Sequence, residues 1–129
     1  MFYTCYNKCG EKVMKIYLII SESYYFIKQT LDEIYGDFSN VVKINYNDSL
    51  IDDILYEFSS VSLFDEKKYV VVENAEEIFS KSFDSGSLTD YLENPSEITT
   101  VIFVTKKVEK TNKYLKKILK DYKVYDNTE

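Results

Sequence analysis

Residues 62–72 read SLFDEKKYVVV, and this stretch decides the fold class. Its last four residues, 69–72, are apolar, and three of them are valine. A strand of this composition leaves no face for water, so it belongs inside a sheet that helices cover on both sides. Leu63 and Phe64 precede the strand and are separated from it only by the charged residues 65–68. Because these charges must stay solvated, we expect the apolar pair at a surface turn, where it is a candidate binding site for another protein.

Strand and helix patterns alternate along the rest of the chain. Apolar runs and alternating patterns predict strands at residues 16–20, 42–46, 69–72, 100–104 and 124–125, the second of them near a sheet edge because it has a polar face. Apolar positions at helical spacing predict helices at residues 26–34, 50–58, 75–79, 88–92 and 114–119, with a loop at 84–87. The predicted order is that of an α/β domain with three layers, a mostly parallel five-stranded sheet with helices on both faces.

Polar residues ahead of these helices are candidate caps. The turn at residues 21–23 supplies a cap for the first helix, which ends near Gly36. Asp48 or Ser49 is the predicted cap of the second helix, and Thr111 that of the last.

Composition narrows the classes of function. The chain has 129 residues, the length of one domain, and a net charge of −6. This acidic balance argues against a protein whose main role is to bind phosphate backbones, because that role needs a basic face. The sequence contains no arginine and no histidine, which removes imidazole catalysis, histidine-ligated metals and arginine fingers.

Cysteine content and hydropathy predict the compartment. Cys5 and Cys9 are too few for a four-ligand zinc site, and we expect neither a disulfide nor a bound metal. No segment has the length of a membrane span or the apolar core of a signal peptide. We therefore expect a cytoplasmic protein.

Phosphate binding requires glycines that let backbone amides close on the anion, as in the pattern GxxxxGK[ST]. Gly10, Gly36 and Gly86 are the only glycines, and the loop after the first strand reads SESYY at residues 21–25. The sequence therefore predicts no phosphate loop, which argues against a nucleoside triphosphatase acting in this chain alone.

Two other constellations bear on function. Glu22, Glu73 and Lys106 follow three predicted strands and mimic the acidic pocket of a phosphorylation-receiver domain, although Glu73 is one methylene longer than the aspartate that such domains phosphorylate. A receiver-like domain or another α/β nucleotide-binding module is the alternative function, and polar strand ends are the structural explanation. A second set of residues gives the last helix a basic face that is either a solvated surface or a weak nucleic-acid or partner contact: Lys113, Lys116 and Lys117.

Four stretches of the chain occur together in one known family. They read MKIYLIISESYYFI at 14–27, SLFDEKKYVVVENA at 62–75, YLENP at 91–95 and TTVIF at 99–103. In this order they resemble the first domain of the delta subunit of the bacterial DNA polymerase III clamp loader, from residue 14 to residue 125. The chain departs from that family at Ser21, where the family usually has glycine, and at residues 1–13, which match nothing in it.

The resemblance implies an AAA+ or RecA-like fold without a functional phosphate loop. It divides the chain into an unmatched extension, 1–13, and a clamp-binding domain, 14–129, with the family's lid and collar domains absent from this chain. It also implies a role in DNA replication, as part of a DNA polymerase holoenzyme, a nucleotidyltransferase. In that family the delta subunit has no catalytic activity of its own, and it binds the β sliding clamp and opens the ring while ATP is used elsewhere in the loader.

The same resemblance assigns the contact residues and the partners. Leu63 and Phe64 correspond to the apolar pair that enters the clamp, flanked by Ser62 and Asp65. The other implied partners are the delta prime and tau or gamma subunits, mainly through the domains that this chain lacks. DNA is contacted only indirectly, and no cofactor, metal or membrane is implied.

Overall fold

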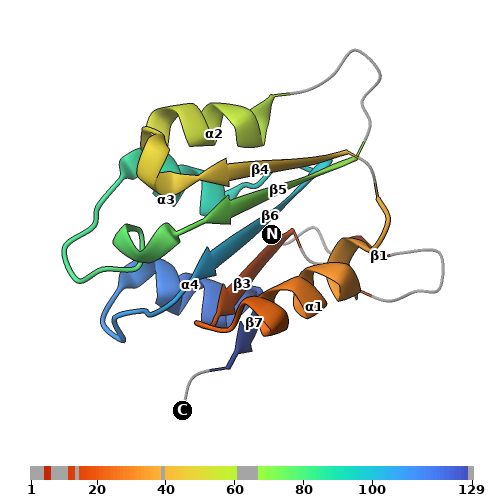
Figure 1. The fold of residues 1–129 in the computed structure, drawn as a ribbon. Coiled ribbons are helices and arrows are strands. Elements are labelled where there is room, and N and C mark those ends of the chain that lie inside the picture. The colour runs from red at the N-terminus through yellow and green to blue at the C-terminus, as the bar shows by residue number, and fades with distance from the viewer. Residues whose placement is uncertain (1–4, 7–11, 14, 39, 61–66, 128–129) are drawn as a thin grey trace.

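The computed structural model describes residues 5–6, 12–13, 15–38, 40–60 and 67–127. Its main part is a sheet with helices on both faces, so the chain forms three layers (Figure 1). The strands are all parallel and lie in the order β4-β5-β6-β3-β7. This confirms the predicted fold class and the predicted strands, whose bounds are β3 (Ile16–Ile20), β4 (Val41–Asn45), β5 (Lys68–Glu73), β6 (Thr99–Thr105) and β7 (Lys123–Asp126).

The composition of each strand matches its place in the sheet. Every residue of β6 is buried, and so is every residue of β5 except Glu73. Strands β4 and β7 lie at the two edges and keep exposed residues such as Lys43 and Lys123. The polar face of the second predicted strand therefore did indicate an edge strand.

A separate small sheet lies near the N-terminus and was not predicted. It pairs β1 (Cys5–Tyr6) with β2 (Lys12–Val13) in antiparallel fashion, with Cys5 opposite Val13. Strands of two residues are too short to show an alternating pattern, so this pair could not be predicted from apolar periodicity.

The chain connections explain how the helices are divided between the two faces. The step from β3 to β4 runs along the sheet in the opposite direction to the three later steps. Because crossovers between parallel strands are right-handed, the first helix lies on one face and the later helices lie on the other. The first is α1 (Tyr24–Tyr35), and the others are α2 (Ile51–Ser59), α3 (Gly86–Glu93) and α4 (Lys113–Asp121).

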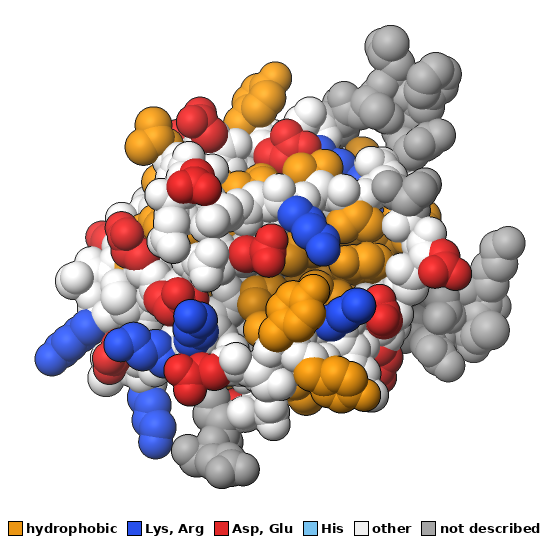
Figure 2. All heavy atoms as spheres, in the orientation of Figure 1, with side chains coloured by type: hydrophobic (Ala, Val, Ile, Leu, Met, Phe, Trp, Pro, Cys, Tyr) orange, Lys and Arg blue, Asp and Glu red, His pale blue; other side chains and the backbone are white. Residues whose placement is uncertain are grey.

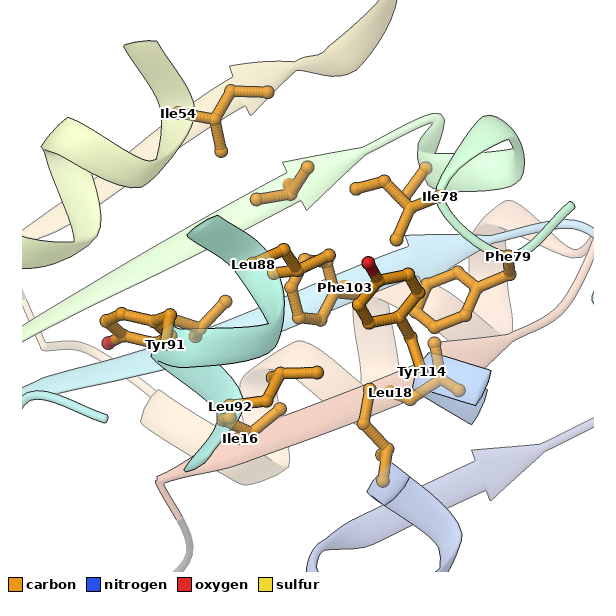
Figure 3. Close-up of a cluster of buried hydrophobic side chains, with 14 of the residues drawn as sticks. Ile16, Leu18, Ile54, Ile78, Phe79, Leu88, Tyr91, Leu92, Phe103 and Tyr114 are labelled. Atoms are coloured by element: carbon orange, nitrogen blue, oxygen red, sulfur yellow. The ribbon is translucent and has the colours of Figure 1, made fainter. Parts of the chain in front are cut away.

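The larger hydrophobic cluster fills the space between the sheet and helices α2, α3 and α4 (Figure 3). Phe103 of β6 lies at its centre, with ring centroids 6.0 Å from Phe58 and 5.7 Å from Phe79, both edge to face. A smaller cluster packs under α1, where Leu31 meets Val71 and Ile102. Two layers of apolar side chains thus fix the sheet from both sides.

Several helix termini differ from the prediction. Ser23 caps α1 as expected, because its Oγ accepts a hydrogen bond from the Phe26 amide at 3.2 Å. Neither Asp48 nor Ser49 caps α2, which begins after Leu50 without a side-chain cap. The reason is a 3₁₀ turn, η1 (Tyr46–Asp48), which delays the start of the helix.

Other helix predictions need smaller corrections. Asn112, not Thr111, caps α4, and Leu119 is 58% exposed instead of facing the core. The predicted helix at 75–79 is a 3₁₀ turn, η2 (Ala75–Glu77), and α3 starts inside the predicted loop, with Ser85 as its cap.

The strand order excludes the receiver alternative. Numbered along the chain from β3, the strands lie in the order 2-3-4-1-5. Receiver domains have the order 2-1-3-4-5, in which the first strand lies between the second and the third. Here the first strand lies between the fourth and the fifth, so the resemblance of Glu22, Glu73 and Lys106 to a receiver pocket is not a family relationship.

Candidate partner-binding site

The predicted protein-binding pair belongs to the connection between α2 and β5. Leu63 and Phe64, with Ser62 and Asp65, fall outside the described residues. The structure does describe the two residues that flank the connection, Ser60 and Lys67, and the elements that they adjoin.

Helix α2 provides the first attachment. Ile54, Leu55 and Phe58 are buried on its inner face. The ring centroid of Phe58 lies 5.1 Å from that of Tyr91 in α3, in addition to its contact with Phe103. The last turn of α2 is therefore held by aromatic packing immediately before the segment begins.

Strand β5 provides the second attachment. The Lys68 amide donates to the Ile98 carbonyl at 2.9 Å, and the Tyr69 amide donates to the Asn40 carbonyl at 3.0 Å. The side-chain amide of Asn40 also donates to the Lys67 carbonyl at 3.1 Å. The backbone is thus fixed on both sides from the first residue after the segment.

An ion pair connects the two attachments directly. Lys68 Nζ lies 3.5 Å from Glu57 Oε1, and the side chains are 10% and 34% exposed. Lys68 is the only charged residue among the buried residues of the described chain. Because a buried ammonium needs a partner, this contact ties the end of α2 to the start of β5.

Two large apolar side chains, one on α2 and one just before it, are exposed. Tyr56 is 74% exposed and Leu50 is 71% exposed. Tyr56 lies in the second half of α2, close in sequence to the segment. Leu50 belonged to the predicted apolar stripe of this helix, but it precedes the first helical turn and faces solvent.

The opposite end of the sheet holds a cavity where ligands of α/β proteins usually bind. Its volume is about 220 Å³, and Glu73, Asn74 and Lys106 line it together with residues of α1. Figure 2 shows hydrophobic side chains across the middle of this face, bordered by lysines and acidic residues. Glu22 does not line the cavity, so the structure brings together only two of the three receiver-like residues.

The turn before α1 shows why this cavity has no phosphate cradle. The Ser21 amide donates to the Thr105 carbonyl at 3.0 Å, and the Ser23 amide donates to Ser21 Oγ at 3.0 Å. Ser21 is completely buried, and Asn127 Nδ2 also donates to its Oγ, at 3.3 Å. These amides are engaged inside the protein, so they cannot close around an anion as a phosphate loop does.

The three predicted lysine contacts on α4 are not equivalent. Lys113 Nζ lies 2.5 Å from Asp84 Oδ1, and this hydrogen bond holds the pKa of the Asp84 carboxyl below its ordinary value. Lys117 Nζ lies 2.6 Å from Asp121 Oδ2, and this contact with the carboxylate raises the pKa of Lys117. Lys116 is exposed. Two members of the set are therefore engaged by carboxylates within the domain.

Comparison with known proteins identifies the family. The family model described as "DNA polymerase III, delta subunit" matches residues 17–127. The chain belongs to the DNA polymerase III delta subunit family. A search of curated proteins found no match.

Solved structures agree with this assignment at the level of the fold. The DNA clamp loader delta protein of Bacillus subtilis superposes with a TM-score of 0.75 at 17% identity, over 93% of this chain and 40% of that one. A DNA polymerase III gamma subunit-related protein from Thermotoga maritima gives a TM-score of 0.55 at 14% identity, over 90% of this chain and 42% of that one. The chain thus spans less than half the length of the proteins that it resembles.

The described part of the chain shows neither a membrane-spanning helix nor a cluster of metal ligands. Across residues 15–38, 40–60 and 67–127, no helix is long and apolar enough to cross a membrane. In the same part of this delta-family chain, no group of three or more His, Cys, Asp or Glu side chains could hold a metal ion.

Proposed function

We propose that this chain acts in DNA replication as the delta-subunit domain that binds the β sliding clamp and helps to open its ring, without hydrolysing ATP. The match of residues 17–127 to the delta family carries this proposal. The packing of α2 and the pairing of β5 support it, because they fix where in the domain the connection that carries Leu63 and Phe64 begins and ends. The remaining loader subunits, delta prime and tau or gamma, would bind mainly through parts of delta-family proteins that residues 1–129 do not cover.

Leu63 and Phe64 would be the anchor of the interaction, with Ser62 and Asp65 at its rim. Burying two such side chains in an apolar pocket contributes about 3 to 6 kcal/mol before the costs of association. A small number of buried apolar anchors commonly carries most of the binding free energy of an interface. Tyr56, exposed on α2, is a candidate for additional contact area.

Ring opening would follow from preferential binding. A ligand that binds the open form of the clamp more tightly than the closed form shifts the population toward the open form. This step needs no nucleotide in the delta-family domain. The hydrogen bonds that engage the Ser21 and Ser23 amides support a domain without a phosphate loop.

The proposal predicts that Leu63→Ala with Phe64→Ala weakens binding to the sliding clamp of the same organism by at least about 100-fold, since it removes roughly 3 kcal/mol or more of apolar burial. The melting temperature should change by no more than about 2 °C if the pair does not belong to the core. Calorimetric titration and thermal unfolding measure the two quantities.

A matched control is available in α1. Tyr24 and Tyr25 are adjacent, large and 78% and 75% exposed, so Tyr24→Ala with Tyr25→Ala removes a similar apolar area from another surface. This variant should keep the affinity of the unmodified chain. If the Leu63 and Phe64 variant unfolds many degrees lower yet still binds, the two residues are packing residues and the proposal is wrong.

A further inference from the structure

Charge is distributed very unevenly along this acidic chain. Residues 105–123 contain eight of its 16 basic residues, all of them lysine, and only two of its 22 acidic residues. That stretch therefore carries a charge of +6, while the remainder carries −12, which together give the net −6. The overall charge thus conceals a strongly basic segment inside an acidic protein.

The structure places most of these lysines on one part of the surface. The segment forms the end of β6, the loop to α4, and α4 itself. Figure 2 shows lysine side chains gathered at the lower left, over that loop and the start of α4. We define the basic surface as four exposed lysines of this loop and of the outer side of α4, Lys107, Lys110, Lys116 and Lys120. Lys106 is also exposed but lines the cavity at the end of the sheet.

The ion pairs separate this surface from its neighbours. Lys113 and Lys117 pair with Asp84, Glu93 and Asp121, as far as the described residues show. In that same part of the chain, none of the four lysines of the basic surface has a carboxylate oxygen within 4.0 Å. Their ammonium groups are therefore available to an external anion.

The segment's own acidic residues cancel little of this charge, and from outside the segment Glu76 Oε2 accepts a hydrogen bond from the Lys106 amide at 3.2 Å. Asp121 is held by Lys117, which leaves Glu109 as the exposed carboxylate of the segment. The inner side of α4 is fixed in the core by Tyr114, Leu115 and Ile118, so the helix holds its outer lysines at a constant spacing. Residues 116 and 120 are one turn apart on that outer side.

We propose that the basic surface binds the phosphate backbone of duplex DNA without reading its sequence. Lysine is a compact point charge that attracts phosphates but lacks the bidentate geometry with which arginine recognises guanine. Release of counterions from DNA would supply the binding free energy. The inference goes beyond the proposed function, in which the domain touches DNA only indirectly, and it does not rest on clamp binding.

An acidic protein is a weaker candidate for the partner. Protein interfaces depend on a buried centre of aromatic or arginine anchors. The exposed large apolar group of α4 is Leu119 alone, at 58%. The negative remainder of the chain also disfavours every other approach of DNA, so contact should occur through this face only.

The test measures binding of a short fluorescent duplex of arbitrary sequence by anisotropy at low salt, for the whole 129-residue chain. The logarithm of the affinity should fall against the logarithm of salt concentration with a slope of about 3 to 4, because each phosphate contact contributes about 0.9. In the variant Lys110→Gln, Lys116→Gln, Lys120→Gln, the affinity should fall at least tenfold and the slope to about 1. The side chains changed in this variant and in the control below are all exposed, so both variants should keep the stability of the unmodified chain. Urea unfolding measures that stability.

The control is Lys28→Gln, Lys43→Gln, Lys81→Gln, which removes three exposed lysines from other parts of the surface. It changes the net charge equally and should alter the affinity less than threefold. Equal loss in both variants, or no binding by the unmodified chain at low salt, overturns the proposal. So does a basic-surface variant that keeps DNA binding but loses the clamp, because the partner would then be a protein.

Discussion

Tyr91 illustrates how a single residue links packing to pH dependence. Its ring lies against Phe58 in the core, and its Oη accepts a hydrogen bond from the Ser96 amide at 3.4 Å. Burial raises the pKa of Tyr91 from 10.0 to about 12. The folded state therefore favours the neutral phenol more strongly than the unfolded state does.

The sign of the effect on stability follows from this shift. A raised pKa in the folded state contributes stability that is complete below pH 10 and is lost as the pH rises toward 12. Between pH 9 and pH 11, we predict that the free energy of unfolding of Tyr91→Phe falls by about 1 kcal/mol less than that of the unmodified chain. Urea unfolding at a series of alkaline pH values measures this difference.

Tyr24→Phe is the matched control, because it removes a phenol that is 78% exposed instead of one in the core. Parallel stability curves for Tyr91→Phe and the unmodified chain would contradict the assigned cause.

Helix caps show the limit of prediction at the residue scale. Ser23 could be identified because it precedes a clear helical pattern and makes only local bonds. Asn112 could not be preferred to Thr111, since both residue types cap helices. Asn112 is selected by tertiary contacts, because its side-chain amide also donates to the Ile78 and Ser80 carbonyls at 2.9 and 2.7 Å.

At the scale of elements, the attachment of α2 to β5 depends on an asymmetric ion pair. Lys68 is the more deeply buried partner, while Glu57 reaches solvent. Removing the carboxylate leaves a buried ammonium without a partner. Replacing the lysine by an apolar side chain of similar length leaves only a hydrated carboxylate.

We therefore predict that Glu57→Gln destabilises the domain by about 1 to 2 kcal/mol, and that Lys68→Met costs less. The double variant should be as stable as Lys68→Met, since it no longer contains the buried ammonium. Urea unfolding of the three variants forms a double-mutant cycle. Additive effects would show that the two side chains do not interact.

Element prediction succeeded where burial dictates composition. The apolar runs of β3, β5 and β6 are required by a sheet covered on both faces, and all three strands were predicted within two residues of their bounds. The start of α2 was missed because Leu50 is apolar yet exposed, and apolar periodicity alone counts it as part of the helix.

At the scale of the whole molecule, topology had to come from the structure. Alternating strands and helices predicted a parallel sheet, but they fit the strand order of a receiver as well as the order observed. The order is set by which strands pair, as when Leu18 lies opposite Phe103, and such long-range pairing leaves no local pattern.

The candidate site was predicted from the charged residues 65–68 and from the family resemblance together. Hydropathy alone would count Leu63 and Phe64 as core residues, and both lie outside the described residues, so their role stays a proposal. The lysines show the opposite case. Their clustering is plain in the sequence, but which of them are engaged by carboxylates is visible only in three dimensions.

In the proposed function, this domain binds and opens a sliding clamp without nucleotide. The most direct measurement is the rate at which the clamp leaves circular DNA when the chain is added without ATP. We predict faster release that saturates with chain concentration and is absent with Leu63→Ala, Phe64→Ala. An unchanged rate at concentrations that saturate clamp binding would contradict the claim.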